Sequence, residues 1–152
     1  MIDTLLTTVK DKTDTDVTIF ATSQLGMSPL CSIFMKEYGA LMASGRAWPR
    51  MTATNKTKAI HVQIDEKIVG FITYELSLEW GTCYIFFSWI DEKFRGRGIY
   101  KLMFAELEQL CRMSRCYKIH SDAHVDNVEI IEAHRAVGMQ TVFYKNEKTI
   151  KP

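Results

Sequence analysis

Two glycines set among basic residues are the part of this sequence best suited to bind a ligand. The run Arg95-Gly96-Arg97-Gly98 follows an apolar stretch, Cys83 to Ile90, that is typical of a buried strand. It precedes a stretch, Ile99 to Cys111, in which apolar residues recur at helical spacing. A helix N-terminus carries unpaired N–H groups and partial positive charge, and glycine lets a ligand approach them closely. The sequence therefore predicts an anion site between a strand and a helix.

The pattern of the glycines narrows the choice of anion. A P-loop requires Gly-Lys-Ser/Thr, which is absent here, and a dinucleotide fingerprint requires a glycine where Lys101 stands. The run from Arg95 to Tyr100 instead resembles the Arg/Gln-x-x-Gly-x-Gly/Ala signature of the GNAT superfamily of N-acetyltransferases, whose loop binds the pyrophosphate of acetyl-coenzyme A. Tyr100 departs from that signature, because the family has a small residue at this position.

A second motif supports the resemblance, which extends over roughly residues 17–150. In many family members the last helix follows Asn-x-x-Ala-x-x-Leu-Tyr-x-x-x-Gly-Phe, and Asn127 and Gly138 keep the spacing of its first and last conserved helix positions. His134 stands where the family often has a tyrosine that acts as general acid toward the coenzyme thiolate, and some branches carry histidine there. Met139 replaces the phenylalanine of the motif.

The resemblance also implies which residues contact the coenzyme. The main chain of the strand ending at Ile90 is expected to bind pantetheine and the acetyl carbonyl, the loop amides the pyrophosphate, and Asn127 the pantetheine. The basic side chains of the loop either add charge toward the phosphates or form a solvated rim. The expected coenzyme-binding residues are Ser88, Trp89, Ile90, Arg95, Gly96, Arg97, Gly98, Ile99, Tyr100, Lys101 and Asn127.

Acetyl transfer to an amine by direct attack requires removal of an amine proton. At pH 7 a lysine-like amine costs roughly 4–5 kcal/mol to deprotonate, whereas a coenzyme-like thiol costs only about 2 kcal/mol to ionise. A general base therefore matters more than an acid, and we expect Glu75 or Glu79 to be that base. Alternation places both on the strand face of Val69 and Phe71, where the alternative is a pair of solvated carboxylates. His134 is the candidate acid, and its alternative is a core histidine with a satisfied hydrogen bond.

The other segments predict one mixed α/β domain over residues 1–152. Residues 1–16 are expected to be a frayed start or a short edge element, and Ser28-Pro29 to begin a helix that ends near Gly45. A hairpin, then strand, helix, strand, helix and strand follow. The expected strands are 17–21, 58–64, 68–78, 83–90, 117–121 and 139–144, with a short return after residue 147. This order resembles the GNAT fold, a central mixed, mostly antiparallel sheet of six to seven strands flanked by about four helices.

One segment, Arg46 to Thr57, has no regular period and holds Trp48 and Pro49 between arginines. We expect it to be a loop or a short helix with loops. Such a segment either lines a substrate entrance or covers the edge of the core.

Composition sets limits on the function. Nineteen basic and eighteen acidic residues nearly cancel, which argues against a nucleic-acid binder built on the basic loop and helix. No apolar run approaches the roughly 18 residues of a membrane span, so we expect a cytoplasmic protein without a membrane partner. Four cysteines without metal-ligand spacing are expected to be core residues. The alternating His120, Asp122, His124 and Asp126 form no recognised ligand pattern, and no metal is expected.

The sequence thus predicts an acetyl-coenzyme A dependent N-acetyltransferase that acts in a ternary complex without a covalent intermediate. Its acceptor is expected to be a primary amine of a small molecule, a lysine side chain or a protein N-terminus. The alternative is a catalytically weak GNAT-like module that binds coenzyme A or a partner protein, as Tyr100 and the missing tyrosine suggest. Similar folds often form homodimers, which leaves a dimer open here.

Overall fold

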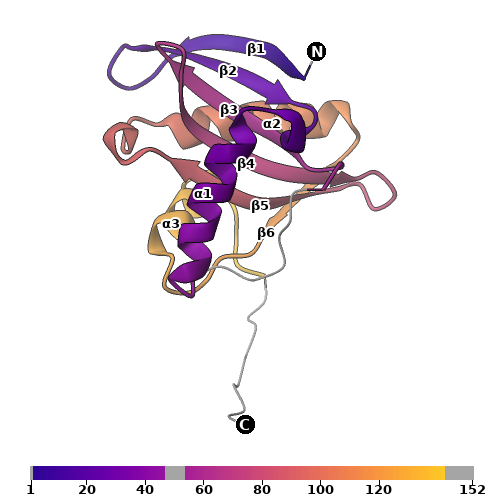
Figure 1. Cartoon of the computed structure of the whole chain (residues 1–152). Coiled ribbons are helices and arrows are strands. Elements are labelled where there is room, and N and C mark those ends of the chain that lie inside the picture. The colour runs from indigo at the N-terminus through magenta and orange to yellow at the C-terminus, as the bar shows by residue number, and fades with distance from the viewer. Residues whose placement is uncertain (1, 47–53, 143–152) are drawn as a thin grey trace.

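A single six-stranded sheet forms the centre of the computed structural model, which describes residues 2–46 and 54–142. The strands lie in the order β1-β2-β3-β4-β5-β6 (Figure 1). Neighbouring strands are antiparallel except for β5 and β6, which are parallel. Their bounds are β1 Asp3–Lys10, β2 Asp16–Thr22, β3 Lys58–Ile64, β4 Lys67–Ser77, β5 Thr82–Ile90 and β6 Lys118–Ser121. The expected mixed, mostly antiparallel sheet is confirmed.

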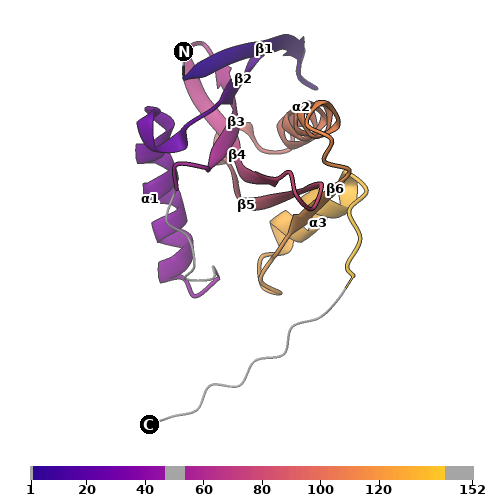
Figure 2. The same ribbon diagram turned by 90° about the vertical axis from the view of Figure 1, so that its right-hand side faces the viewer.

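Helices cover both faces of this sheet, as Figure 2 shows. Helix α1 (Leu30–Ala43) lies on one face, and α2 (Ile99–Met113) and α3 (Val128–Ala136) lie on the other. Two short 3-10 turns, Leu25–Met27 and Glu92–Phe94, complete the helical elements of the described residues. The described part of the chain therefore has three α-helices, one fewer than expected, and none is long and apolar enough to cross a membrane.

The N-terminal segment forms an edge strand and not a frayed start. Strand β1 pairs with β2 from Asp3 to Lys10, with one register shift between Leu5 and Thr7. A partly buried edge strand suits the threonines here, because β-branched side chains fit a half-buried pleated surface. The turn that follows β1 reaches the loop at the start of α2, so this strand has a direct bearing on the site.

Each face of the sheet has its own core. On the α1 face Phe34 packs against Phe71 and Phe87, with ring centroids 6.3 Å and 6.0 Å apart. On the α2 face Met103 and Leu107 are fully buried against the strands. Period-two alternation in the strands and the apolar stripe of each helix account for this division.

Two expectations on local structure were wrong. The pairing of β3 and β4 shifts by one residue at Val69, which therefore packs with Ile72 on the α2 face and not with Phe71. A β-bulge of this kind adds one residue and breaks the alternation. Residues 139–142 form no strand after α3, although Gly138 ends that helix with φ +86° as expected. The rest of that expected strand, like Trp48 and Pro49, lies outside the described residues.

Candidate active site

Strand β5 has a neighbour on both sides for only half of its length. Its pairing with β6 runs from Thr82 to Ile85, and beyond this point no described strand lies against that edge. The pairing with β4 also shifts by one residue here, which leaves Phe86 as a bulge. Backbone groups along the edge from Phe86 to Ile90 thus lack the ladder partners that a central strand normally has. They are available to hydrogen-bond a ligand.

The open half of β5 leads directly into the predicted glycine loop. The Asp91 carboxylate accepts the Lys93 N–H and the Lys67 ammonium, both at 3.1 Å, and so closes the 3-10 turn. Gly96 and Gly98 have φ of +73° and +81°, which glycine adopts without steric cost. Gly98 is the N-cap of α2, so the first N–H groups of the helix, which have no partner within the helix, lie beside it. The order strand, loop, helix N-terminus is confirmed.

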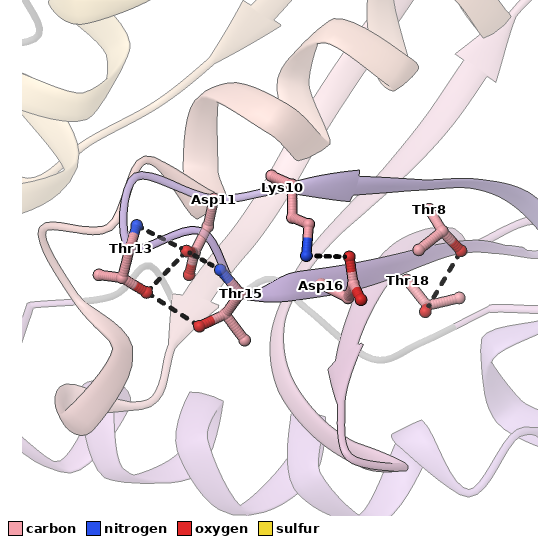
Figure 3. A network of polar contacts seen from close by, with 7 residues as sticks. All are labelled: Thr8, Lys10, Asp11, Thr13, Thr15, Asp16 and Thr18. Atoms are coloured by element: carbon pink, nitrogen blue, oxygen red, sulfur yellow. Dashed lines mark hydrogen bonds and ion pairs between the residues drawn. The ribbon is translucent and has the colours of Figure 1, made fainter.

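The turn between β1 and β2 is fastened to this loop. An Asp11 carboxylate oxygen lies 2.6 Å from the Arg97 guanidinium, and the two side chains are 0% and 19% exposed. The other oxygen of Asp11 accepts the N–H groups of Thr13 and Thr15, as Figure 3 shows. Burial alone raises the pKa of Asp11, but hydrogen bonds from Thr13, Thr15 and Arg97 outweigh it and lower the pKa to about 2. Arg97 therefore holds the loop in place and is not a free cation.

The same turn supplies a cation that the sequence motifs did not indicate. The Lys12 N–H donates to the carbonyl of Arg97 at 3.1 Å, and the Lys12 side chain lies over Gly98. Together with the glycines it lines an open cavity of about 200 Å³. The cavity is lined by Lys12, Ile90, Phe94, Gly96, Gly98, Ile99, Tyr100, Lys101, Ala133 and Ala136. Nothing in the local sequence around Lys12 indicates this placement, because only the fold brings β1 beside α2.

Two residues that were predicted to bind the coenzyme, Trp89 and Arg95, have their side chains on the α1 face of the sheet. The Trp89 ring packs against Phe71 on the α1 face, with centroids 5.6 Å apart, and the Arg95 Nε donates to the carbonyl of Ile90 at 3.1 Å. Both side chains line a second cavity, about 470 Å³ in volume, beside the Lys36 and Glu37 of α1. Only the main chain of Trp89 faces the open edge of β5, so the structure divides the predicted set between two faces.

Buried polar groups gather between β5, α2 and α3. Within residues 2–46 and 54–142, Ser88 Oγ, Tyr100 Oη and His134 Nε2 have no hydrogen-bond partner of good geometry. The ring centroids of Tyr100 and His134 are 6.2 Å apart. Burial raises the pKa of Tyr100, an effect that the nearby Ser88 hydroxyl partly opposes. Burial also lowers the pKa of His134 to about 4, so its imidazole is neutral at pH 7.

The Asn127 side chain accepts a hydrogen bond from Arg46, which follows the helix on the opposite face of the sheet. Its Oδ1 accepts from Arg46 Nη2 at 3.3 Å, and the same guanidinium lies 3.1 Å from Glu129. Arg46 follows α1, whereas Asn127 and Glu129 lie at the start of α3. This contact joins the two faces of the sheet beyond the end of β6. Any ligand that takes the Asn127 amide must share it with Arg46 or displace that side chain.

The two candidate bases have different surroundings. Glu75 Oε1 accepts the hydroxyls of Thr54 and Thr57, each at 2.8 Å, and Glu75 pairs across the sheet with Tyr84 of β5. Glu79 is exposed in the turn after β4, which ends at Ser77. The two carboxylates therefore do not share a strand face, contrary to the expectation. Glu75 is held in place by its threonine partners and lies opposite the half of β5 that pairs with β6.

The cysteines and histidines form no metal centre in the described part of the chain. No group of three His, Cys, Asp or Glu side chains there is arranged to hold an ion. Cys83, Cys111 and Cys116 are buried in the α2-face core, as expected for small core residues. Asp122 accepts the Tyr84 hydroxyl at 2.6 Å.

The depressed pKa of His134 predicts a loss of stability in mild acid. Between pH 6.5 and about 4 the unfolded chain takes up a proton at this position and the folded protein does not, so stability falls as the pH drops. The expected loss between pH 7 and 4.5 is about 2 kcal/mol for a shift of this size. Urea unfolding across this range is expected to show a smaller loss for His134→Gln than for the wild type. Burial also lowers the pKa of His61, so some slope is expected to remain in the variant; equal slopes in both proteins contradict the prediction.

Several solved structures with this architecture are named as acetyltransferases. An aminoglycoside acetyltransferase from an uncultured soil metagenomic sample, in complex with trehalose, matches with a TM-score of 0.67 at 13% identity, covering 89% of this chain and 97% of that one. A ribosomal-protein-alanine N-acetyltransferase from Brucella melitensis biovar Abortus 2308 matches with a TM-score of 0.61 at 16% identity, covering 88% and 99%. An aminoglycoside N-acetyltransferase, AAC(6')-Iy, in complex with CoA matches with a TM-score of 0.56 at 15% identity, covering 87% and 95%. At such low identity these likenesses define the fold.

The family follows from the sequence itself. Residues 27–139 match the model of the acetyltransferase (GNAT) family. Because the match spans most of the chain, from the last residue of the first 3-10 turn to just beyond α3, the protein belongs to the GNAT family of acetyltransferases. The resemblance to GNAT superfamily N-acetyltransferases is thereby confirmed. A comparison with curated proteins found no matching relative.

Proposed function

We propose that this GNAT protein transfers an acetyl group from acetyl-coenzyme A to a primary amine by direct attack in a ternary complex. The observation that carries the proposal is the continuity of the site. The unpaired half of β5 runs into two positive-φ glycines and the N-terminus of α2, with Lys12 beside them. An extended ligand with an anionic end matches this arrangement, because the strand edge offers backbone hydrogen bonds and the helix N-terminus offers an anion site.

The charges of the groups along the cavity indicate where each part of acetyl-coenzyme A would bind. The N–H groups from Gly96 to Lys101, with the Lys12 and Lys101 ammonium groups, would bind the pyrophosphate. The backbone of Ser88 to Ile90 would bind pantetheine and orient the thioester carbonyl. Arg97 contributes its main chain, since its guanidinium is paired with Asp11. Asn127 would contact pantetheine if Arg46 releases it.

The reaction requires one base and a stabilised leaving group. Glu75 is the proposed base: it takes the amine proton directly or through water as the new N–C bond forms and the C–S bond breaks. His134 is the proposed acid group at the thiolate. Because its imidazole is neutral at pH 7, its contribution is a hydrogen bond to the departing sulfur more than a stored proton. No cysteine takes part in this scheme.

Glu75→Gln is expected to lower kcat roughly 100-fold, the usual size of a general-base contribution, with coenzyme affinity within twofold. The amide is isosteric and can still accept from Thr54 and Thr57. Glu79→Gln, in the exposed turn, is the matched control and is expected to keep wild-type turnover. Steady-state release of free thiol measures both. Equal turnover of the Glu75→Gln variant and the wild type rules out Glu75 as the base.

The proposed acceptor is a primary amine, and the kind of molecule that carries it has to be found by experiment. Among the structural neighbours are enzymes named for aminoglycosides and for a ribosomal protein alanine. Accordingly, a small-molecule amine, a lysine side chain and a protein N-terminus are the three acceptor classes proposed here. A cytoplasmic location and a homodimeric state also remain predictions.

Two measurements test the proposed function. Titration calorimetry is expected to show acetyl-coenzyme A binding in the micromolar range, and thiol release across aminoglycosides, polyamines, lysine peptides and N-terminal peptides is expected to identify the acceptor. The absence of binding at high micromolar ligand contradicts the proposal. Binding without turnover on every amine supports the catalytically weak module instead.

A further inference from the structure

Two neighbouring turns carry exposed large apolar side chains that neither the fold nor the proposed site explains. One turn joins β4 to β5, and the other runs from the end of α2 to the start of β6. The Tyr117 N–H donates to the carbonyl of Gly81 at 2.9 Å, and Thr82 pairs with Lys118, so the two turns lie side by side. The side chains, here called the two-turn patch, are each 70–79% exposed: Leu78, Trp80, Met113 and Tyr117.

The composition of the two-turn patch indicates contact with something outside the fold. Apolar side chains scattered singly are normal on a protein surface, whereas several within two adjoining turns mark an interaction site. Trp80 and Tyr117 each combine an apolar ring with one polar group. Side chains of this kind favour the boundary between water and hydrocarbon.

Basic residues accompany the apolar ones. Arg115 and Lys118 are exposed, and within the described residues neither forms an ion pair. Among residues 78–81 and 113–118 the sequence has a single carboxylate, that of Glu79. The two turns therefore combine apolar side chains with a net positive charge, which complements an anionic lipid surface.

Arg115 carries its charge in a backbone conformation that favours glycine. Its φ is +58°, and it directly follows Ser114, the C-cap of α2, at the position where helices commonly end on glycine. A Cβ is strained in this left-handed region, and glycine would remove the strain. The presence of arginine where the backbone favours glycine indicates that its charge has a use outside the fold.

The size and shape of the two-turn patch favour a lipid layer over a protein as the partner. Residues 78–81 and 113–118 are far fewer than the roughly 20–30 residues on each side of a standard protein interface. A fluid lipid layer deforms around side chains that stand out from a turn, so it needs no matching pocket. Charge and shape thus indicate the same partner.

We propose that the two-turn patch docks the protein on an anionic membrane surface, with Trp80 and Tyr117 entering the headgroup layer and Arg115 and Lys118 close to the lipid phosphates. The glycine loop follows the other end of β5, whose nine residues span roughly 25–30 Å, so docking leaves the candidate active site open. Docking of this kind does not depend on the proposed acetyl transfer. The sequence has no apolar run long enough to span a membrane and so predicted no membrane partner, but a patch assembled from two turns needs no such run.

Co-sedimentation with lipid vesicles tests the apolar part of the patch. Phosphatidylcholine vesicles with about one third phosphatidylserine are expected to bind the protein at least tenfold more tightly than pure phosphatidylcholine vesicles. Trp80→Ser is expected to lower the affinity for the anionic vesicles at least tenfold, and Met113→Ser about fivefold. Met35→Ser is the matched control, because Met35 is 55% exposed on α1, away from the two turns, and is expected to keep the affinity within twofold.

Arg115→Gly tests the charge with two readouts that move independently. The affinity for the anionic vesicles is expected to fall about fivefold, the usual contribution of one basic side chain near a lipid surface. The melting temperature of the free protein is expected to stay the same or rise, because glycine fits φ +58° without strain. A residue with a purely structural role would not combine these two results.

Four outcomes overturn the inference. The first is no binding of the wild-type protein to the anionic vesicles at millimolar lipid. The second is an equal effect of Met113→Ser and Met35→Ser, and the third is wild-type affinity in Trp80→Ser or in Arg115→Gly. The fourth is self-association of the protein without lipid that Trp80→Ser abolishes, since a second copy of the chain then covers the two-turn patch.

Discussion

Gly98→Glu is expected to weaken acetyl-coenzyme A binding at least 100-fold, the largest effect on binding expected for a single loop residue. Three costs combine at this position. The backbone has φ +81°, which costs a non-glycine residue about 1–2 kcal/mol. An added Cβ would lie 3.2 Å from Lys12 Cε, so the Lys12 side chain has to shift. The new carboxylate would then occupy the helix N-terminus where an anion is proposed to bind.

Gly98→Gln is the matched control, because it has the same strain and bulk without the charge. We expect it to lose about tenfold, so that roughly another tenfold separates the glutamine and glutamate variants at low salt. Calorimetry at two salt concentrations measures that difference, which should shrink as salt screens the charge. If the Gly98→Gln and Gly98→Glu variants bind acetyl-coenzyme A equally at both salt concentrations, the phosphates of the coenzyme lie elsewhere. Circular dichroism checks that both variants fold.

The glycine loop was predictable because its information is local. Positive φ at Gly96 and Gly98, the apolar strand before them and the helical period after them all lie within about thirty residues of sequence. The same holds for the hairpin of β3 and β4 and for Gly138 at the end of α3. Local propensity and periodicity are enough to place elements of this kind.

Contacts between distant segments could not be predicted in the same way. The Arg97 side chain was predicted either to add charge toward the phosphates or to form part of a solvated rim. Instead it pairs with Asp11, and Lys12 lies beside the loop. Both partners lie in a stretch whose threonines and aspartates had suggested either fraying or an edge element. The N–H groups of Thr13 and Thr15 donate to Asp11 and so close this turn, which contacts the loop through Arg97. Only the pairing of β1 with β2 makes that placement possible.

The prediction of which residues share a strand face failed where the sheet is irregular. Alternation assumes an unbroken period of two, and the bulge at Val69 breaks it, while the end of β4 at Ser77 removes Glu79 from any strand face. The irregularity at Phe86 is of the same kind and lies where β6 stops. The departures from regular pairing thus include the one that opens β5 to a ligand, and a sequence period does not reveal them.

The environment of a titratable group was equally hidden. His134 was placed on the apolar stripe of its helix, which left an acid or a satisfied core histidine as alternatives. In the structure it is buried with its Nε2 unpartnered among the described residues, close to Tyr100. The Tyr100 ring lies near Phe104 and His134, and the residue also lines the cavity beside the loop. Neither arrangement follows from spacing, because each depends on three elements meeting.

Asp11→Asn is expected to lower the melting temperature by on the order of 5–10 °C, the usual consequence of leaving one member of a buried ion pair without its partner. Asparagine keeps the shape and can still accept from Thr13 and Thr15, so the loss reports the charge on Arg97, which is 19% exposed. Asp16→Asn is the control. Its carboxylate pairs with Lys10 at 2.8 Å in the same hairpin (Figure 3), but both side chains are more than half exposed. Exposed pairs contribute little, and we expect a change of under about 2 °C.

The pH dependence of the Asp11 effect distinguishes the ion pair from other causes. The pKa of Asp11 is lowered from 3.8 to about 2, so its stabilising contribution is complete above pH 3.8 and is lost as the pH falls toward 2. The difference in stability between wild type and Asp11→Asn is therefore expected to be constant from pH 7 to 5 and to close below pH 4. The double variant Asp11→Asn, Arg97→Gln should lose less than the sum of the two single changes. Additive losses, or a difference in stability between wild type and Asp11→Asn that persists at pH 2, show that the turn is held by its backbone contacts alone. If Asp11→Asn also binds the coenzyme more weakly, the β1–β2 turn keeps Lys12 and the loop in the binding geometry.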